Sequence, residues 1–195
     1  MIDQSITFPQ DTIAYSCPTW DELDALTLQV ANQVLASESK FDVIVALAKG
    51  AWPMSRSFVD YTKIPELMSL GVRFYSGINQ RLAEPSVYQT LPSSVAGKKV
   101  LIFDDVADSG ESLVFTKKYL LEQGAALVAT ATLMMKPHTI LKPDFYAHTT
   151  STWIIFPFEK REMCELLGKK WQGQGVGEEE IKERFEQLKI NSRWR

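Results

Sequence analysis

The chain has 195 residues, of which 45% are hydrophobic and 23% charged, and its formal net charge at pH 7 is −3. This length and composition are those of one globular domain with a single hydrophobic core. A slightly acidic chain without a basic cluster argues against binding to nucleic acid or to an anionic membrane through overall charge. An anionic ligand would therefore depend on a few local cations and on backbone amides.

The two cysteines and the N-terminal sequence indicate the cellular compartment of the protein. Cys17 and Cys164 are the only cysteines, and they lie far apart without the spacing of a zinc site or a redox pair. We expect free thiols in a reducing compartment. The first ten residues lack the basic and apolar regions of a signal peptide, and no run of about eighteen apolar residues occurs. These features predict a cytoplasmic protein.

The apolar pattern of the first hundred residues predicts alternating helices and strands. Thr19 and Glu22 have the spacing of a capping box, so a helix is expected to begin between them. The polar stretch 76–97 is long for a loop; such loops are either disordered or functional lids, although residues 87–90 also favour a hairpin strand. The predicted elements are helix Trp20–Ala36, strand Asp42–Leu47, helix Pro53–Tyr61 and strand Leu67–Tyr75.

The same alternation continues through the second half of the chain. Gly124 is placed where a left-handed helix cap is expected. The pattern of alternating strands and helices predicts an α/β fold, with a mostly parallel sheet and helices on both faces. The predicted elements are strand Val100–Phe103, a helix from near Leu113 to Gln123, strand Ala126–Met134, strand Asp144–Thr149, the apolar run Trp153–Phe156, a linker at 172–177 and helix Glu178–Lys189.

The stretch 100–112 contains the residues with the clearest chemical pattern. An apolar strand is followed by Asp104, Asp105 and Asp108, and then by small hydroxylic residues that lead into a helix. Ligands of open α/β sheets bind at the carboxyl ends of strands, and a helix N-terminus there favours a phosphate. Carboxylates accept hydrogen bonds from hydroxyls or help to place a divalent cation. The stretch therefore predicts a sugar-phosphate site, and the alternative is a solvated acidic turn.

Other phosphate sites fit this stretch less well. A Walker-type site would need a G-x-x-x-x-G-K-[ST] loop, which the sequence lacks. A receiver-like phosphoacceptor is disfavoured because the small phosphate-holding residues follow the acids directly.

Two segments resemble a known family. VLIFDDVADSGES resembles the signature of the type I phosphoribosyltransferases, and its loop Asp108-Ser109-Gly110-Glu111-Ser112 resembles the D-[ST]-G-x-[ST] loop of the hypoxanthine/guanine/xanthine branch. Residues 153–159, WIIFPFE, resemble the W-I-x-x-P-[WF]-[DE] stretch of the xanthine/guanine branch and of archaeal purine enzymes. The resemblance covers about residues 41–159. It implies a type I phosphoribosyltransferase-like fold with a small hood that recognises the purine and a C-terminal helix.

The resemblance implies roles for the acidic loop. Asp104 and Asp105 would bind the ribose hydroxyls of phosphoribosyl pyrophosphate (PRPP) and, indirectly, Mg²⁺. Asp108 would be the catalytic acid/base residue, because a positioned carboxylate can take the proton that the purine loses. The 5′-phosphate would be held by Asp108, Ser109, Gly110, Glu111 and Ser112 through backbone N–H groups and hydroxyls.

The resemblance also implies a pyrophosphate site and a purine site. Lys49 and Gly50 would form the pyrophosphate loop, which in relatives often contains a non-proline cis peptide, and Arg73 would reach the pyrophosphate or brace the lid. Lys136 would donate to the exocyclic oxygen of a 6-oxopurine. Trp153 would stack on the base, with the Ile154 carbonyl and Glu159 at its far edge.

Each of these residues also has a simpler interpretation. Lys49-Gly50 is the composition of an ordinary turn, and Arg73 and Lys136 are also compatible with solvated surface positions. The aromatic residues of 153–159 are also compatible with a place in the core. His138 and His148, the only histidines, lack metal-ligand spacing and are assigned to surface or turn positions.

The resemblance as a whole implies a purine-salvage phosphoribosyltransferase. Such an enzyme transfers the 5-phosphoribosyl group of PRPP to hypoxanthine, guanine or xanthine, with Mg²⁺, and releases pyrophosphate. We expect one domain over residues 1–195, with a core at about 19–168 and a C-terminal helical extension at 169–195, and a homodimer. The alternative is a regulatory protein that kept the fold as a ligand sensor without turnover.

Overall fold

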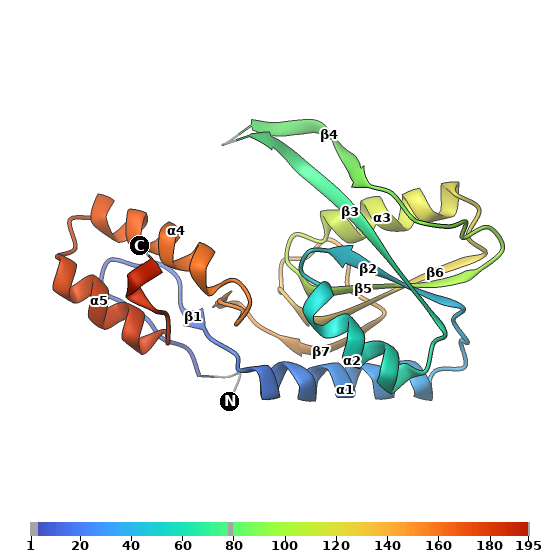
Figure 1. The fold of residues 1–195 in the computed structure, drawn as a ribbon, viewed down its shortest axis with the longest axis horizontal. Helices are drawn as coiled ribbons and strands as arrows, with labels where there is room; N and C mark the ends of the chain where they lie inside the picture. The colour runs from blue at the N-terminus through green and yellow to red at the C-terminus, as the bar shows by residue number, and fades with distance from the viewer. Residues whose placement is uncertain (1–3, 78–79, 195) are drawn as a thin grey trace. The chain divides into compact units, whose positions relative to one another are not determined.

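The computed structural model describes residues 4–77 and 80–194, with the backbone alone at 74–77 and 80–84 (Figure 1). The described chain forms two compact units. Residues 24–150 make up the first, which we call the sheet unit, and residues 4–23 with 151–194 make up the second, which we call the terminal unit. The expectation of one domain with a C-terminal extension stays a prediction.

The sheet unit is built on a six-stranded sheet in the order β4-β3-β2-β5-β6-β7. Neighbouring strands are parallel except for the antiparallel pair β3 and β4. The strands are β2 (Val43–Ala48), β3 (Glu66–Gly77), β4 (Gln80–Gln89), β5 (Lys99–Ala107), β6 (Leu127–Met135) and β7 (Phe145–Thr149). This arrangement confirms the predicted α/β fold with a mostly parallel sheet.

Helices cover both faces of this sheet (Figure 1). They are α1 (Trp20–Ala36), α2 (Trp52–Thr62) and α3 (Glu111–Glu122). Leu120 of α3 belongs to the same buried cluster as Ile102 of β5, whereas Phe58 of α2 stacks on Phe103, with 4.1 Å between ring centroids. Ile102 and Phe103 are consecutive strand residues and therefore point to opposite faces. α3 thus covers one face and α2 the other.

Local sequence signals set the ends of these helices. The Glu22 N–H donates to Thr19 Oγ1 at 3.2 Å, and the Thr19 N–H donates to Glu22 Oε2 at 2.8 Å. The predicted capping box and the start of α1 at Trp20 are therefore confirmed. Gly124, just beyond α3, has φ of +86°, the left-handed conformation predicted for it.

Much of the polar stretch 76–97 is a strand. β3 continues to Gly77, and β4 pairs with it from Gln80 to Gln89, while residues 78 and 79 lie outside the described residues. Val87 is paired with Val72, in agreement with the β propensity noted at 87–90. β4 is an edge strand, where Pro85 is tolerated because the missing N–H can face away from the sheet.

The terminal unit combines a short parallel strand pair with two helices. Its elements are β1 (Tyr15–Ser16), β8 (Trp153–Ile154), α4 (Lys160–Gly173), α5 (Glu178–Gln187) and the 3₁₀-helix η1 (Ser192–Trp194). α5 confirms the predicted C-terminal helix. α4 is not among the predicted elements, although Cys164, Leu167 and Trp171 recur at helical spacing and are all buried. None of the described helices has the length and hydropathy of a membrane span.

A buried carboxylate fixes the N-terminal segment to α4. Asp11 Oδ1 lies 2.8 Å from Lys170 Nζ, and Asp11 Oδ2 accepts hydrogen bonds from Tyr15 OH at 2.7 Å and Trp171 Nε1 at 3.0 Å. Burial alone would raise the pKa of Asp11, but the hydrogen bonds from Lys170, Tyr15 and Trp171 outweigh burial and the pKa is lowered. The ionised carboxylate therefore stabilises the folded terminal unit.

A buried guanidinium completes the same contact. Arg184 of α5 is 2% exposed, and its guanidinium carbon lies 5.2 Å from the ring centroids of both Phe8 and Trp171. Arg184 Nη2 donates to Gln10 Oε1 at 3.0 Å, and Nε donates to Glu180 Oε1 at 3.2 Å. The residues around Phe8 are thereby held against both α4 and α5.

Replacing Asp11 tests this arrangement. Asp11→Ala leaves the buried donors of Tyr15 and Trp171 without their acceptor, so we expect the free energy of unfolding at pH 7 to fall by about 2 kcal/mol. The pKa of Asp11 is lowered in the folded chain, so its contribution is present above the unfolded value of about 3.9 and is lost as the pH falls through the folded value. Urea denaturation should show the difference from wild type narrowing below about pH 4. The exposed Glu183→Ala in α5 is the control; equal losses in both variants would contradict the account.

Candidate active site

Three neighbouring parallel strands deliver the predicted residues of the sheet unit to one edge. β2 pairs with β5 and β5 with β6, so the connections that follow these strands lie side by side. Lys49 and Gly50 follow β2, Asp108 and Ser109 follow β5, and Lys136 follows β6. The site described below is built from these three connections.

The two consecutive acids lie inside β5. The strand runs on to Ala107, whereas the sequence pattern indicated that it ends at Asp104. Asp105 is 8% exposed and Asp104 is half-buried. Asp104 Oδ1 accepts the Asp105 N–H at 3.0 Å, and Asp105 Oδ1 accepts the Val106 N–H at 2.7 Å. The backbone hydrogen bonds thus fix one oxygen of each carboxylate.

Burial makes this pair difficult to ionise. It raises the pKa of Asp105 to about 6, and it raises the pKa of Asp104 well above its usual range, with the charge of Asp105 adding to the effect. A group that offers hydrogen-bond donors or positive charge would stabilise both carboxylates. The pair is therefore suited to vicinal hydroxyls or to a cation.

The chemistry of this donor set fits Mg²⁺ in an indirect role. Magnesium prefers oxygen ligands, keeps several of its waters and is often bound through one or two carboxylates together with substrate phosphates. Asp104 and Asp105 supply two adjacent carboxylates whose repulsion a nearby cation would offset. Asp104 and Asp105 are therefore the residues that could hold a metal together with an anionic ligand.

The connection after β2 packs directly against one of these acids. A Cβ added at Gly50 would lie 2.6 Å from Asp105 Oδ2, so glycine allows the backbone to approach the carboxylate. The peptide between Ala48 and Lys49 is cis, as the resemblance implied for this loop. Lys49 is exposed. The structure thus brings the predicted pyrophosphate loop beside the predicted ribose-binding acids.

The connection after β5 turns sharply into α3. Gly110 has φ of +82°, and α3 begins at Glu111, two residues before the predicted start. The Glu111 N–H donates to Ser109 Oγ at 3.3 Å. In general, the N–H groups in the first turn of a helix have no intrahelical acceptors and can bind an external group. With Ser112 in that first turn, the loop and helix start are suited to an anion.

The connection after β6 supports the loop after β5. A Cβ at Gly110 would lie 2.5 Å from Thr139 Oγ1, so the two connections are in close contact. Lys136 is 7% exposed; burial lowers its pKa, and the negative charge of Asp108 acts in the opposite direction. The structure thus brings the predicted purine lysine close to the predicted acid/base residue.

His138 adds a contact that the sequence analysis did not find. Its Nε2 lies 3.1 Å from Asp108 Oδ1, although 30 positions separate the two residues in the chain. No short motif could have indicated this contact, because it depends on how the connections after β5 and β6 meet. His138 does lie in a turn, as expected, but its ring engages a candidate catalytic residue.

Arg73 has a partner on the neighbouring strand. Its guanidinium carbon lies 4.9 Å from the centroid of the Tyr88 ring, and a Cβ at Gly71 would lie 2.5 Å from the same ring. The ring therefore spans β3 and β4 above Gly71. Both roles expected of Arg73, reaching the pyrophosphate and bracing the lid, stay predictions.

The remaining purine candidates belong to the terminal unit. Trp153 is 46% exposed on β8, Ile154 is buried, and Glu159 lies directly before α4, where its N–H donates to Phe156 O at 3.1 Å. Exposure of the Trp153 ring agrees with a stacking surface rather than with a core position. The roles of these three residues at the base stay predictions.

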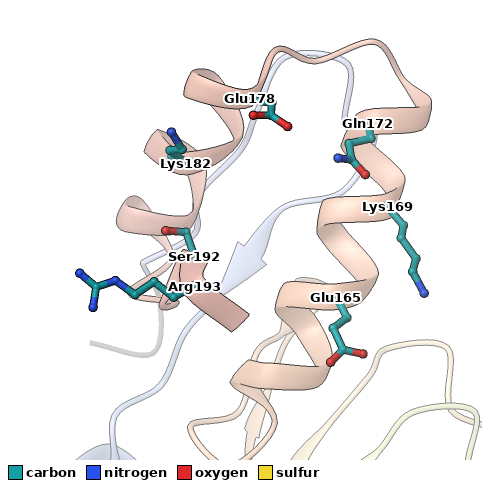
Figure 2. A pocket seen from close by; sticks show the side chains of 7 residues that line it. All are labelled: Glu165, Lys169, Gln172, Glu178, Lys182, Ser192 and Arg193. Carbon is teal, nitrogen blue, oxygen red and sulfur yellow. The ribbon is translucent and has the colours of Figure 1, made fainter. Parts of the chain in front are cut away.

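A cavity of about 610 Å³ also lies in the terminal unit, between α4 and α5 (Figure 2). It is lined by Glu165, Lys169, Gln172, Glu178, Lys182, Ser192 and Arg193. Its acidic and basic side chains are mostly exposed, and Lys182 already donates to Glu179 at 2.6 Å. None of the residues predicted from the sequence to bind substrate lines it, so the strand ends of the sheet unit remain the better candidate site.

Comparisons with known proteins agree with this geometry. Residues 19–161 match the family described as phosphoribosyl transferase domain. The xanthine-guanine phosphoribosyltransferase of Gluconobacter oxydans is 25% identical over 150 residues, which are 76% of this chain and 86% of that protein. The hypoxanthine-guanine phosphoribosyltransferase of Lactococcus lactis is 26% identical over 125 residues, 62% of this chain and 68% of that protein.

A solved structure shows the same fold. The purine phosphoribosyltransferase from Pyrococcus horikoshii superposes with a TM-score of 0.66 and 29% sequence identity, covering 74% of this chain and 93% of that chain.

Two glycines with the same backbone conformation test the packing of the site. Gly110 and Gly97 both have positive φ, but a Cβ would meet Thr139 at Gly110 and open space at Gly97. Gly97→Ala should lower the free energy of unfolding by about 1–2 kcal/mol for the left-handed backbone alone. Gly110→Ala should lower it by about 1–3 kcal/mol more, because it also overpacks the contact between the two connections. Equal losses in urea denaturation would mean that the connections are not packed as described.

Proposed function

This chain belongs to the phosphoribosyl transferase domain family, and from that membership we propose that it is a purine-salvage phosphoribosyltransferase. It transfers the 5-phosphoribosyl group of PRPP to a 6-oxopurine base, namely hypoxanthine, guanine or xanthine. The products are the nucleoside 5′-monophosphate and pyrophosphate. The relatives named above support this reaction class. The residues of the sheet unit support the roles that we assign to them.

One observation supports the proposal most strongly. The ends of β2, β5 and β6 and the connections that follow them meet at one sheet edge, where they bring together a lysine-glycine loop, the two adjacent carboxylates of β5 and a buried lysine. These groups match the needs of a substrate with a pyrophosphate, a ribose and a carbonyl-bearing base. The close approach of Gly50 and Asp105 joins the first two of these groups.

The PRPP half of the reaction depends on binding and orientation. We assign the ribose hydroxyls to Asp104 and Asp105, whose pKa values are raised by burial and which hydroxyl donors would stabilise in the ionised form. The 5′-phosphate is assigned to the loop 108–112 and the first turn of α3. Mg²⁺, when bound with the pyrophosphate, supplies charge neutralisation for the leaving group. Holding PRPP at both ends orients its anomeric carbon for attack.

The purine half of the reaction needs one proton transfer. As the purine ring nitrogen attacks the anomeric carbon, the bond from that carbon to the pyrophosphate oxygen breaks, and the proton on the base moves to the carboxylate of Asp108. Positive charge develops on the ribose as in glycoside chemistry, and the nearby carboxylates stabilise it. Lys136 donates a hydrogen bond to the exocyclic oxygen of the base.

The pyrophosphate and the far edge of the base involve further residues. Lys49 and Gly50 are assigned to the pyrophosphate. Arg73 is assigned to the pyrophosphate or to bracing the lid, and its guanidinium lies over the ring of Tyr88. Trp153, Ile154 and Glu159 are assigned to the base, and the exposed ring of Trp153 supports that assignment.

Location and assembly complete the proposal. Both cysteines are free thiols, which agrees with a reducing, cytoplasmic setting. A homodimer is proposed from the family resemblance, and sedimentation of the purified chain tests it directly.

Turnover is the decisive test of the function. Pyrophosphate release should be measured with PRPP, Mg²⁺ and each of hypoxanthine, guanine, xanthine, adenine and orotate. We expect turnover with a 6-oxopurine and a fall in kcat of about 10²–10⁴-fold in Asp108→Asn, the range that general acid–base catalysis contributes. PRPP binding without turnover on any base would contradict the proposal and favour a ligand sensor.

Substituting Lys136 tests base recognition separately from PRPP binding. Lys136→Met removes the buried donor, so the KM for the 6-oxopurine should rise by about 10–100-fold while the KM for PRPP stays unchanged. The preference for 6-oxopurines over adenine should narrow. Lys142→Met, in the same connection but with its ammonium over the Tyr146 ring, is the control. If the KM for PRPP rises and the KM for the 6-oxopurine does not, Lys136 binds PRPP and its assignment to the base is wrong.

A further inference from the structure

On either side of His138, the connection after β6 is hydrogen-bonded to the end of β5 and to the loop that follows it. The Lys136 N–H donates to Ala107 O at 2.9 Å, and the Ile140 N–H donates to Ser109 O at 2.9 Å. These backbone hydrogen bonds fix the turn at 136–141 relative to the acidic loop. The position of His138 beside that loop is therefore set by backbone contacts and does not depend on its own side chain.

The direction of the hydrogen bond between His138 and Asp108 follows from an ionised Asp108. Nε2 of His138 lies 3.1 Å from Asp108 Oδ1. An ionised carboxylate only accepts hydrogen bonds, so the imidazole donates its Nε2–H. This bond occupies one oxygen of Asp108 and restricts rotation of the carboxylate. The other oxygen, Oδ2, is left to accept a proton from a ligand.

The exposure of His138 and Asp108 indicates that their hydrogen bond contributes little to the stability of the fold. The side chains of His138 and Asp108 are 68% and 62% exposed, and exposed pairs of this kind add little to stability. The exposure also leaves Asp108 accessible to a substrate. The charge of Lys136 also interacts with Asp108, but Lys136 is buried whereas the side chain of His138 is exposed. Orientation of the carboxylate is the effect that remains for His138.

We propose that His138 is a positioning residue for Asp108. It holds Oδ1 by its Nε2–H, so that Oδ2 takes the proton from the purine ring nitrogen while the imidazole keeps its own proton throughout. This inference rests on the proposed role of Asp108 as the catalytic base. It adds a residue that neither the acidic motif nor the family resemblance indicated.

A positioning role predicts an effect on kcat rather than on binding. His138→Ala should lower kcat by about tenfold, because misplacing a catalytic group by about 1 Å is enough to cost up to about 10²-fold. The KM values for PRPP and for the base should stay within about twofold, since the interaction acts in the transition state. His138→Gln keeps an N–H donor near the position of Nε2 and should recover most of the lost kcat.

The test is a double-mutant cycle measured by pyrophosphate release. Asp108→Asn, His138→Ala and the double variant are compared with wild type. The control for the loss of an imidazole is His148→Gln, because His148 is the second histidine of the chain and lies on β7. If His138 acts through Asp108, His138→Ala will cause no further loss of kcat in the Asp108→Asn background. A further tenfold loss in that background, or failure of His138→Gln to recover activity, would overturn the proposal.

The cycle also separates this inference from the proposed function. If Asp108→Asn leaves kcat unchanged, the role of Asp108 as the base is wrong, whatever His138 does. If Asp108→Asn lowers kcat but His138→Ala does not, the role of Asp108 stands and the positioning role alone is overturned. Thermal unfolding of each variant, compared with wild type, shows whether a loss of kcat comes from unfolding.

Discussion

Asp104 and Asp105 place two carboxylates next to each other at the carboxyl end of a buried strand, and the rest of the site is arranged around them. Because the pKa of both acids is raised in the folded chain, ionising them as the pH rises from about 4, the unfolded value, lowers the free energy of unfolding. For Asp105 this loss extends to a pH of about 6. This loss of stability agrees with the role proposed for the pair in binding hydroxyls and a cation.

The three connections at the sheet edge restrict one another. Gly50 allows the loop after β2 to reach Asp105, and Gly110 allows the loop after β5 to pack on Thr139. Hydrogen bonds between the connections after β5 and β6 then hold Lys136 near Asp108. The groups assigned to ribose lie in β5, and those assigned to phosphate are on the loop that follows it; a rigid parallel sheet keeps them in register with Lys136 after β6. The terminal unit has its own core around Trp171, with buried Asp11 holding the N-terminal segment in place.

Local patterns made most of the fold and part of the site predictable from sequence. The capping box at Thr19 and the valine-rich strands depend on neighbouring residues, and the structure confirms both. The contact between His138 and Asp108 and the approach of Gly50 to Asp105 depend on how distant segments meet, so no local motif encodes them. α4 was predictable in principle from the spacing of its buried residues. The true end of β5 differs from the predicted one because aspartate is uncommon within strands, so the sequence pattern predicts a strand end where Asp104 follows the apolar run.

Calorimetric titration of PRPP with Mg²⁺ into wild type and into the Asp104→Asn/Asp105→Asn variant measures whether these two carboxylates bind PRPP. Asparagine keeps the oxygens that accept the N–H groups of Asp105 and Val106. The account predicts saturable binding to wild type and affinity at least about tenfold weaker in the variant, since hydrogen bonds to charged groups are the stronger ones. It also predicts that the variant is at least as stable as wild type at pH 8, because the repulsion is gone. Equal affinity for PRPP in the two proteins would contradict the claim that these carboxylates form its binding site.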